Sequence, residues 1–168
     1  AKNNQTPELI LKLSNLLDYI LYQTKKSLVP LQSEIDHLQD YLSLEKLRHG
    51  EKLEIKASFP TQNTQIQIAP MLFLPLLENS FKHGKSQGNQ TQVELKIETE
   101  ENQIYFFLKN SFEEDTSKTN LNSSGIGLQN IQKRLDLLYP KCHEFILGKS
   151  NGYFIVNLSI SASQPKSQ

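Results

Sequence analysis

The sequence predicts an α+β fold in which helices cover one face of a mixed sheet, as a two-layer α/β sandwich preceded by a helical hairpin. Three observations carry this prediction. Two segments with apolar residues at helical spacing come first, segments of alternating apolar and polar residues follow, and two further helical segments lie between these strands. Elements in this order pack their helices against one side of a sheet.

The first fifty residues predict two amphipathic helices. Leucine and isoleucine recur at helical spacing over residues 7–23, after the start signal Thr6-Pro7. A second helix is expected over about residues 31–49, with Gly50 as its C-cap. An amphipathic hairpin needs a partner for its apolar stripe, so residues 1–50 are predicted to pack on the rest of the chain or on another chain.

From residue 51 the hydrophobic period changes to that of a sheet. The segments expected to form strands are KLEIKASF, TQIQIAP, TQVELKIET, QIYFFLKN, CHEFILGKS and YFIVNLSIS. An apolar helix is expected over about residues 70–83, although Pro75 fits a helix only where the regular helix begins. A last helix is expected in GIGLQNIQKRLDLLY, where Pro140 ends it. These elements define a second unit, residues 51–162.

Two segments carry no periodicity. Residues 111–124, SFEEDTSKTNLNSS, are polar throughout and are predicted to form a mobile loop. The tail, residues 163–168, is expected to be frayed.

Charge and composition narrow the class of protein. The 168 residues include 18 basic and 18 acidic side chains, so the net charge is zero, and the basic residues do not cluster. We therefore expect no nucleic-acid partner and no membrane contact by this segment. The longest apolar run, residues 68–77, is too short to span a bilayer, and no signal peptide is visible. The single cysteine, Cys142, leaves no disulfide within the chain and favours a reducing, cytoplasmic compartment.

The first motif with chemical meaning is SSGIGLQN, residues 123–130. Gly125 and Gly127 stand at the start of a predicted helix, where glycine lets a ligand approach the backbone closely. A helix N-terminus offers unpaired N–H groups and a positive dipole end, so this arrangement suits a phosphate. A glycine-rich turn that merely starts a helix is the alternative.

The second motif is LPLLENSFKHG, residues 74–84. Asn79, Lys82 and His83 share one face of a helix. An amide oxygen suits Mg²⁺, and the two basic side chains suit phosphate oxygens. The adjacent Glu78 is a candidate for proton transfer or for orienting water. The alternative is an ordinary helix end, at which Glu78 and Asn79 face solvent and Gly84 terminates the helix.

Together the two motifs resemble the ATP-binding catalytic domain of sensor histidine kinases of the GHKL superfamily, and most closely those of the LytS/YehU type. The resemblance rests on PMLFLPLLENSFKHG and SGIGLQNIQKRLDLLYP, and the segments LSNLLDYILYQ and LQSEIDHLQDYLSLEKLRHGEKLEI are similar to the stretch that leads into that domain. It covers nearly the whole chain. It implies a Bergerat-type sandwich that binds ATP and Mg²⁺, in which residues 1–50 are the last part of the dimerisation and phosphotransfer region.

The same resemblance implies roles for individual residues. Asn79 is expected to coordinate Mg²⁺ and, with Glu78, to serve catalysis. The residues expected to contact ATP are Asn79, Lys82, His83, Gly84, Asn110, Gly125, Gly127, Leu128, Asn130 and Arg134. For Arg134 a surface ion pair is the alternative. The polar residues 111–124 are expected to form a lid over the nucleotide.

This sequence departs from the family pattern at two points. The superfamily reads adenine with a D-x-G-x-G motif, whereas here the strand QIYFFLKN ends in Asn110-Ser111. Asn110 can still accept a hydrogen bond from the adenine amino group, with weaker binding expected because it lacks a charge. The phosphoacceptor signature, similar to N-P-H-F-L-F-N, is absent, and it is expected to lie N-terminal to Ala1, so this segment is not expected to phosphorylate itself there.

The function implied is transfer of the ATP γ-phosphoryl to a histidine and then to a response regulator. A homodimer through the N-terminal helices and an inner-membrane anchor outside this segment are further expectations. One alternative is a GHKL-fold protein-interaction module whose nucleotide site is degenerate, with Asn110 as the discriminating residue. Another is a serine kinase of the anti-sigma type, which the two N-terminal helices disfavour.

Overall fold

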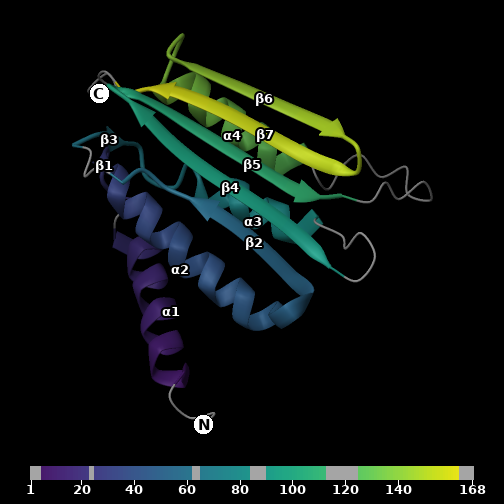
Figure 1. The fold of residues 1–168 in the computed structure, drawn as a ribbon. Helices are drawn as coiled ribbons and strands as arrows, with labels where there is room; N and C mark the ends of the chain where they lie inside the picture. Colours follow the sequence, from purple (N-terminus) through teal and green to yellow (C-terminus); the bar gives the residue numbers. More distant parts are fainter. Residues whose placement is uncertain (1–4, 23–24, 62–64, 84–89, 113–124, 163–168) are drawn as a thin grey trace.

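The computed structural model describes residues 5–22, 25–61, 65–83, 90–112 and 125–162, which form a two-layer sandwich with an additional helix (Figure 1). Its helices are α1 (Gln5–Tyr22), α2 (Leu31–His49), the short 3₁₀ helix η2 (Gly50–Lys52), α3 (Leu74–His83) and α4 (Gly125–Leu138). Its strands are β1 (Val29–Pro30), β2 (Leu53–Ser58), β3 (Gln67–Ile68), β4 (Thr91–Glu100), β5 (Gln103–Ser111), β6 (His143–Ser150) and β7 (Tyr153–Ser161).

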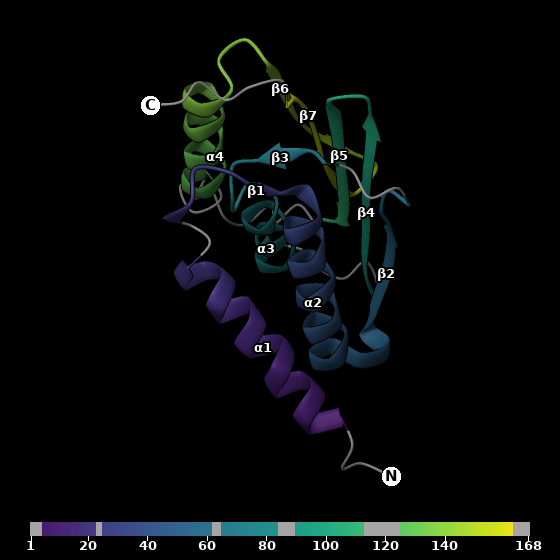
Figure 2. The ribbon, with the colours of Figure 1, turned by 90° about the vertical axis from the view of Figure 1, so that its left-hand side faces the viewer.

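The main sheet is mixed, as predicted. Its five strands lie in the order β2-β4-β5-β7-β6, with β2 parallel to β4 and every other pair antiparallel. The central strand is β5, and near its end Asn110 lies opposite Val93 on β4 and Phe154 on β7. The helices α2, α3 and α4 cover one face of this sheet, and no described helix covers the other (Figure 2). The predicted α+β sandwich is therefore confirmed.

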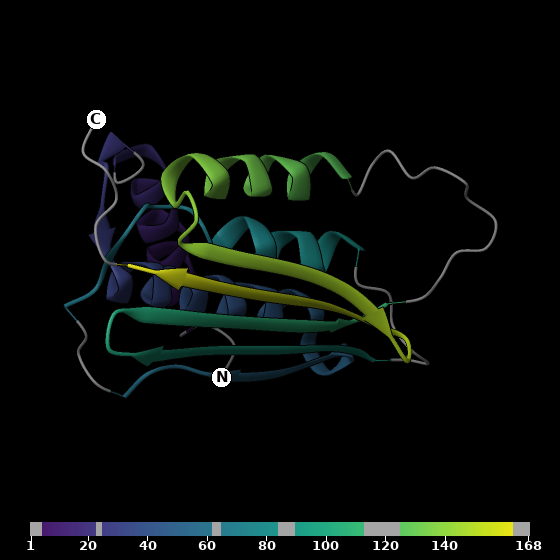
Figure 3. The same ribbon diagram turned by 90° about the horizontal axis from the view of Figure 1, so that it is seen from above.

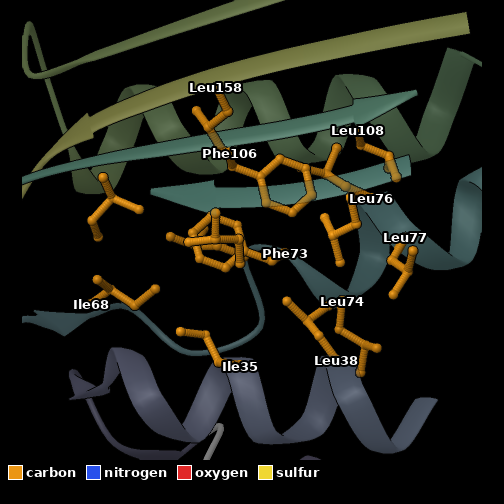
Figure 4. Packing of buried hydrophobic residues seen from close by; sticks show 14 of the residues in the cluster. Ile35, Leu38, Ile68, Phe73, Leu74, Leu76, Leu77, Phe106, Leu108 and Leu158 are labelled. Carbon is orange, nitrogen blue, oxygen red and sulfur yellow. The ribbon is translucent and has the colours of Figure 1, made fainter. Parts of the chain in front are cut away.

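The core lies between the three helices and the sheet (Figure 4). Strand β5 turns Ile104, Phe106 and Leu108 toward the helices, which is the alternation expected of a strand with one buried face. Phe73, just before α3, stacks on Phe106 with 4.8 Å between ring centroids and 7° between ring planes. The residues around α3 are thus anchored on the central strand.

Helix α2 is part of this core, whereas α1 lies outside the sandwich and packs on α2 (Figure 2). Ile35 and Leu38 of α2 belong to the same buried cluster as the strands. Gly50 ends α2 with φ 58° and donates its N–H to the Lys46 carbonyl, as a C-cap does. A unit boundary at residue 50 stays a prediction, but α2 shares its core with the sheet.

Two element predictions need correction. Helix α3 begins at Leu74 instead of near residue 70, so Pro75 lies in the first turn, where no intrahelical partner is lost. The segment TQIQIAP contributes only β3, and β3 pairs with β1 outside the main sheet. The expected tail, residues 163–168, and most of the expected loop, residues 113–124, lie outside the described residues.

The contact between α1 and α2 contains a titratable group. The His37 ring lies against the buried Tyr19 ring, with 3.8 Å between centroids and a tilt of 31° between ring planes. Burial lowers the pKa of the His37 imidazole below its ordinary value of 6.5, against the opposing effect of Asp40 and Asp36. The folded protein therefore takes up this proton less readily than the unfolded chain does, and folding opposes protonation at this position.

We expect the protein to lose stability on mild acidification through this histidine. The stability that the neutral His37 ring contributes is complete above the pKa of this histidine in the unfolded chain. It is lost as the pH falls through the lower pKa of His37 in the folded protein. Urea unfolding at several pH values, from about 7.5 down to about 5, measures the free energy of unfolding. His37→Gln is expected to make the free energy of unfolding depend less on pH. His49→Gln serves as the control, because the His49 ring faces Phe81 on α3. An unchanged slope in His37→Gln would contradict the assignment.

Candidate functional site

The two sequence motifs meet where α3 ends and α4 begins. Asn79 is a half-buried residue of α3, and Gly127 lies in the first turn of α4. A Cβ placed on Gly127 would lie 4.0 Å from the Asn79 side-chain oxygen, Oδ1, which is the only heavy atom of the described residues that it would meet within 4 Å. The amide oxygen of Asn79 therefore faces the first turn of α4, with no described side chain between them.

This juxtaposition lies at one end of the sandwich. The C-terminal end of α3, the N-terminal end of α4 and the C-terminal end of β5 all lie at that end (Figure 3). Helix α4 has 14 residues, which is long enough for a full helix dipole with its positive end at the N-terminus. The N–H groups of its first turn have no partner within the helix. Together with the Asn79 amide, this end can bind an anion and a hard cation.

Asn110 supplies an independent indication of a ligand. It is 1% exposed, near the end of β5, and its Nδ2 donates to the Ser111 carbonyl at 3.1 Å. Its Oδ1 is buried and has no hydrogen-bond partner among the described residues. Leaving a buried acceptor unpaired costs about 1–3 kcal/mol. A ligand that donates a hydrogen bond there would remove this cost, as the adenine amino group expected from the sequence would do.

Glu78 occupies a different side of α3 from Asn79. Burial raises the pKa of the Tyr41 phenol on α2, and the carboxylates of Glu45 and Glu78 raise it further. Glu78 thus lies close to α2, whereas Asn79 faces α4. Consecutive residues on a helix point about 100° apart, which explains this separation. The predicted catalytic role of Glu78 stays a prediction.

The remaining predicted site residues include some whose side chains the structure describes and others whose side chains it does not. Lys82 and Asn130 are exposed, and Leu128 is partly buried against the core. Gly125 begins α4. His83 ends α3 but its side chain is not among the described ones, and Gly84 lies outside the described residues. Their predicted contacts with ATP stay predictions.

Arg134 has hydrogen-bond partners within the protein. Its guanidinium donates through Nη1 to the Met71 carbonyl at 2.6 Å and through Nη2 to the Pro70 carbonyl. It also interacts electrostatically with the Glu34 carboxylate. These contacts give Arg134 a structural role at the backbone of residues 70 and 71. Its predicted contact with nucleotide stays a prediction.

Sequence reasoning missed Glu34. This residue is 2% exposed, and its carboxylate accepts hydrogen bonds from the backbone N–H groups of Met71, Leu72 and Phe73. Burial raises the pKa of its carboxyl above the ordinary value, and the three N–H donors and Arg134 oppose that rise. A signal was present, because Glu34 stands between Leu31 and Ile35 on the buried stripe of α2.

The described residues contain no group of three or more histidine, cysteine or acidic side chains that would hold a metal ion. A metal ion bound near Asn79 would therefore depend on that single amide together with a ligand's own oxygens and water. Mg²⁺ is commonly bound in this way, through few protein oxygens and the phosphates of a nucleotide. None of the described helices is both long and apolar enough to cross a membrane.

The solved structures that resemble this chain define the class of fold. A histidine kinase domain from the blue-light activated histidine kinase of Erythrobacter litoralis covers 92% of this chain with a TM-score of 0.61 at 17% identity, and 76% of that chain is covered. The catalytic domain of the histidine kinase ThkA covers 80% of this chain with a TM-score of 0.55 at 9% identity, over 94% of its own length. The fold of this chain is that of these histidine kinase domains.

Comparison of sequences shows similarity to histidine kinases. The histidine kinase family model matches residues 1–53. Sensor histidine kinase BtsS of Escherichia coli K12 is 30% identical over 129 residues, which is 73% of this chain and 23% of BtsS. Sensor protein LytS of Bacillus cereus is 28% identical over 145 residues, which is 80% of this chain and 25% of LytS. The chain is similar in sequence to the sensor histidine kinases and spans about a quarter of the length of these relatives.

Proposed function

We propose that this chain is the ATP-binding catalytic part of a two-component sensor histidine kinase. It would transfer the γ-phosphoryl of ATP to a histidine N-terminal to residue 1, from which a response regulator would receive it. The observation that carries the proposal is the approach of the Asn79 amide oxygen to Gly127, which joins the two sequence motifs at one end of the sandwich. The unpaired buried Oδ1 of Asn110 adds a site for a hydrogen-bond donor.

Each part of the nucleotide would have its own partners. The first turn of α4 would bind the phosphates through its N–H groups, with Gly127 leaving room for them. Asn79 would supply a protein oxygen to Mg²⁺, and Lys82 and His83 would add positive charge. Asn110 would accept a hydrogen bond from the adenine amino group. Mg²⁺ would neutralise phosphate charge, so catalysis would rest mainly on positioning and charge stabilisation.

We also propose a response regulator as partner and a homodimer in the whole protein. One structure similar in fold is the histidine kinase ThkA in complex with response regulator protein TrrA, which covers 97% of this chain with a TM-score of 0.56. For the dimer, the support is the exposed apolar row on α1, where Ile10, Leu13 and Leu17 are each at least 50% exposed. A cytoplasmic location, with the whole protein anchored in the inner membrane, completes the proposal.

Gly127→Ala tests the phosphate site with opposite effects on binding and stability. Alanine in a helix is more stable than glycine by up to about 1 kcal/mol, so the variant is expected to unfold at a higher temperature. Its methyl group would enter the space between α4 and Asn79, so we expect affinity for a non-hydrolysable ATP analogue to fall about tenfold. Calorimetric titration and thermal unfolding measure the two quantities.

Gly148→Ala on β6 is the control for the glycine-to-alanine change, because a Cβ there meets nothing within 4 Å, whereas one on Gly127 approaches Asn79 Oδ1. It is expected to leave nucleotide affinity unchanged. If Gly127→Ala binds nucleotide as the wild type does, the proposed phosphate site is wrong. If the wild type itself binds no nucleotide, the alternative of a protein-interaction module with a degenerate site gains support.

A further inference from the structure

The segment of residues 69–73, which leads into α3, directs its backbone N–H groups at side chains instead of at other backbone groups. Pro70 has no N–H, and each of the other four residues donates its N–H to a side-chain oxygen. Two carbonyl oxygens of the segment accept from a guanidinium. We call this set of contacts the backbone clamp. Its side chains are Glu34, Arg134 and Tyr139.

Helix α2 provides one side of the clamp. Glu34 Oε1 accepts from the Met71 N–H at 2.8 Å, and Oε2 accepts from the Leu72 and Phe73 N–H groups at 3.2 and 3.4 Å. The carboxylate is almost fully buried. A buried anion needs several donors or a cation nearby, and here it has three donors together with the charge of Arg134.

Helix α4 and the residue after it provide the other side. Arg134 donates to the carbonyls of Pro70 and Met71, and the Tyr139 hydroxyl accepts from the Ala69 N–H at 2.8 Å. Met71 has φ 59°, in the left-handed region that residues other than glycine seldom adopt. Such a backbone conformation persists where the surroundings determine it, and both Glu34 and Arg134 bond to Met71.

The clamp touches each helix that matters to the proposed site. Its last residue, Phe73, accepts the N–H of Leu77 at 3.1 Å and so begins the hydrogen bonding of α3, the helix that carries Asn79. Arg134 lies two turns after Gly127 on α4. Glu34 lies on α2, which α1 contacts. The positions of α3 and α4 relative to each other and to α2 therefore depend on one set of bonds.

We infer that Glu34 is a positioning residue, which acts with Arg134 through the backbone clamp to hold Asn79 and Gly127 at the separation that nucleotide binding requires. This inference rests on the proposed function. If Glu34 has this role, nucleotide affinity depends on the position of α2 relative to α3 and α4. Because coupling between two sites is reciprocal, nucleotide binding must then stabilise the backbone clamp by the same free energy. A brace that only stabilises the fold would have neither property.

Glu34→Gln tests the inference with little change in size. The amide keeps one acceptor oxygen but presents N–H donors to backbone N–H groups, so the clamp loses bonds without leaving a cavity. We expect affinity for Mg²⁺ with a non-hydrolysable ATP analogue to fall about tenfold, within the usual range of coupling between sites. Glu45→Gln is the matched control, a buried glutamate of α2 that pairs with His49. It is expected to bind as the wild type does.

Arg134→Lys and the double variant extend the test from the other helix. Because both residues act through the same segment, the two losses of affinity are expected not to add. Hydrogen exchange on the wild type needs no variant at all: saturating nucleotide should slow exchange of the Met71, Leu72 and Phe73 amides beyond that of the β6 amides.

The outcomes separate the inference from the proposed function. If the wild type binds nucleotide, folded Glu34→Gln binds it equally well and the three amides are not protected, the clamp is only a structural brace and the inference is wrong. If the wild type binds no nucleotide, the proposed function fails and the inference fails with it. Weaker binding by Glu34→Gln, with binding by Glu45→Gln unchanged, would support both.

Discussion

Phe106→Ala is expected to lower the free energy of unfolding by about 3–5 kcal/mol. Phe106 lies on the central strand β5, is 2% exposed, and stacks against Phe73 from the backbone clamp. Truncation removes buried apolar surface and leaves a cavity between the two layers that the rigid strand cannot close. Because typical domains are stable by only about 5–15 kcal/mol, a large fraction of folded protein would be lost on warming.

Urea unfolding of the purified chain measures this change. Leu137→Ala on α4 is the control, since that leucine is 81% exposed and its loss should cost at most about 0.5 kcal/mol. A loss below about 1 kcal/mol in Phe106→Ala would contradict the core as described, because cavity-forming substitutions at buried phenylalanines cost several times more.

Asn110→Leu is expected to separate stability from binding. Leucine removes the buried acceptor that has no partner, and it also removes the Nδ2 hydrogen bond to the Ser111 carbonyl, so the free energy of unfolding should rise by at most about 1 kcal/mol. The same change removes the proposed partner of the adenine amino group, so affinity for ATP analogues should fall at least about tenfold. A site that sacrifices stability for binding is typical of functional residues.

Thermal unfolding and calorimetric titration measure the two effects. Asn157→Leu, an exposed asparagine of the neighbouring strand β7, is the control and should change neither quantity appreciably. If Asn110→Leu is less stable and binds nucleotide normally, then Asn110 is a structural residue, and adenine would have to be recognised elsewhere.

Much of the fold could be predicted because local and long-range signals agree. The alternation in QIYFFLKN places Phe106 and Leu108 on one face, and the structure buries them there. The meeting of Asn79 with Gly127 could be predicted only through the family resemblance, because the two residues are far apart in sequence and neither motif specifies its partner. The segment TQIQIAP is predicted to form a strand, but the shortness of β3 could not be predicted, since its length is set by pairing with β1.

The backbone clamp lay beyond sequence reasoning for a physical reason. A buried glutamate on an apolar stripe signals that a partner exists, but not that the partner is the backbone of Met71, Leu72 and Phe73. The position of Arg134 after the glycine motif suggests a nucleotide contact or a surface ion pair, but it does not reveal that Arg134 lies beside Pro70 and Met71. Contacts of this kind depend on how helices pack.

The most direct test of the proposed nucleotide site is isothermal titration with a non-hydrolysable ATP analogue, with and without Mg²⁺, for the wild type and Asn79→Ala. We expect binding by the wild type that is strengthened by Mg²⁺, and a loss of the order of 10–100-fold in Asn79→Ala that is confined to the titration with Mg²⁺. No heat and no thermal shift in the wild type at about millimolar nucleotide would contradict the proposed function. Equal Mg²⁺ dependence in Asn79→Ala would show that the metal binds elsewhere.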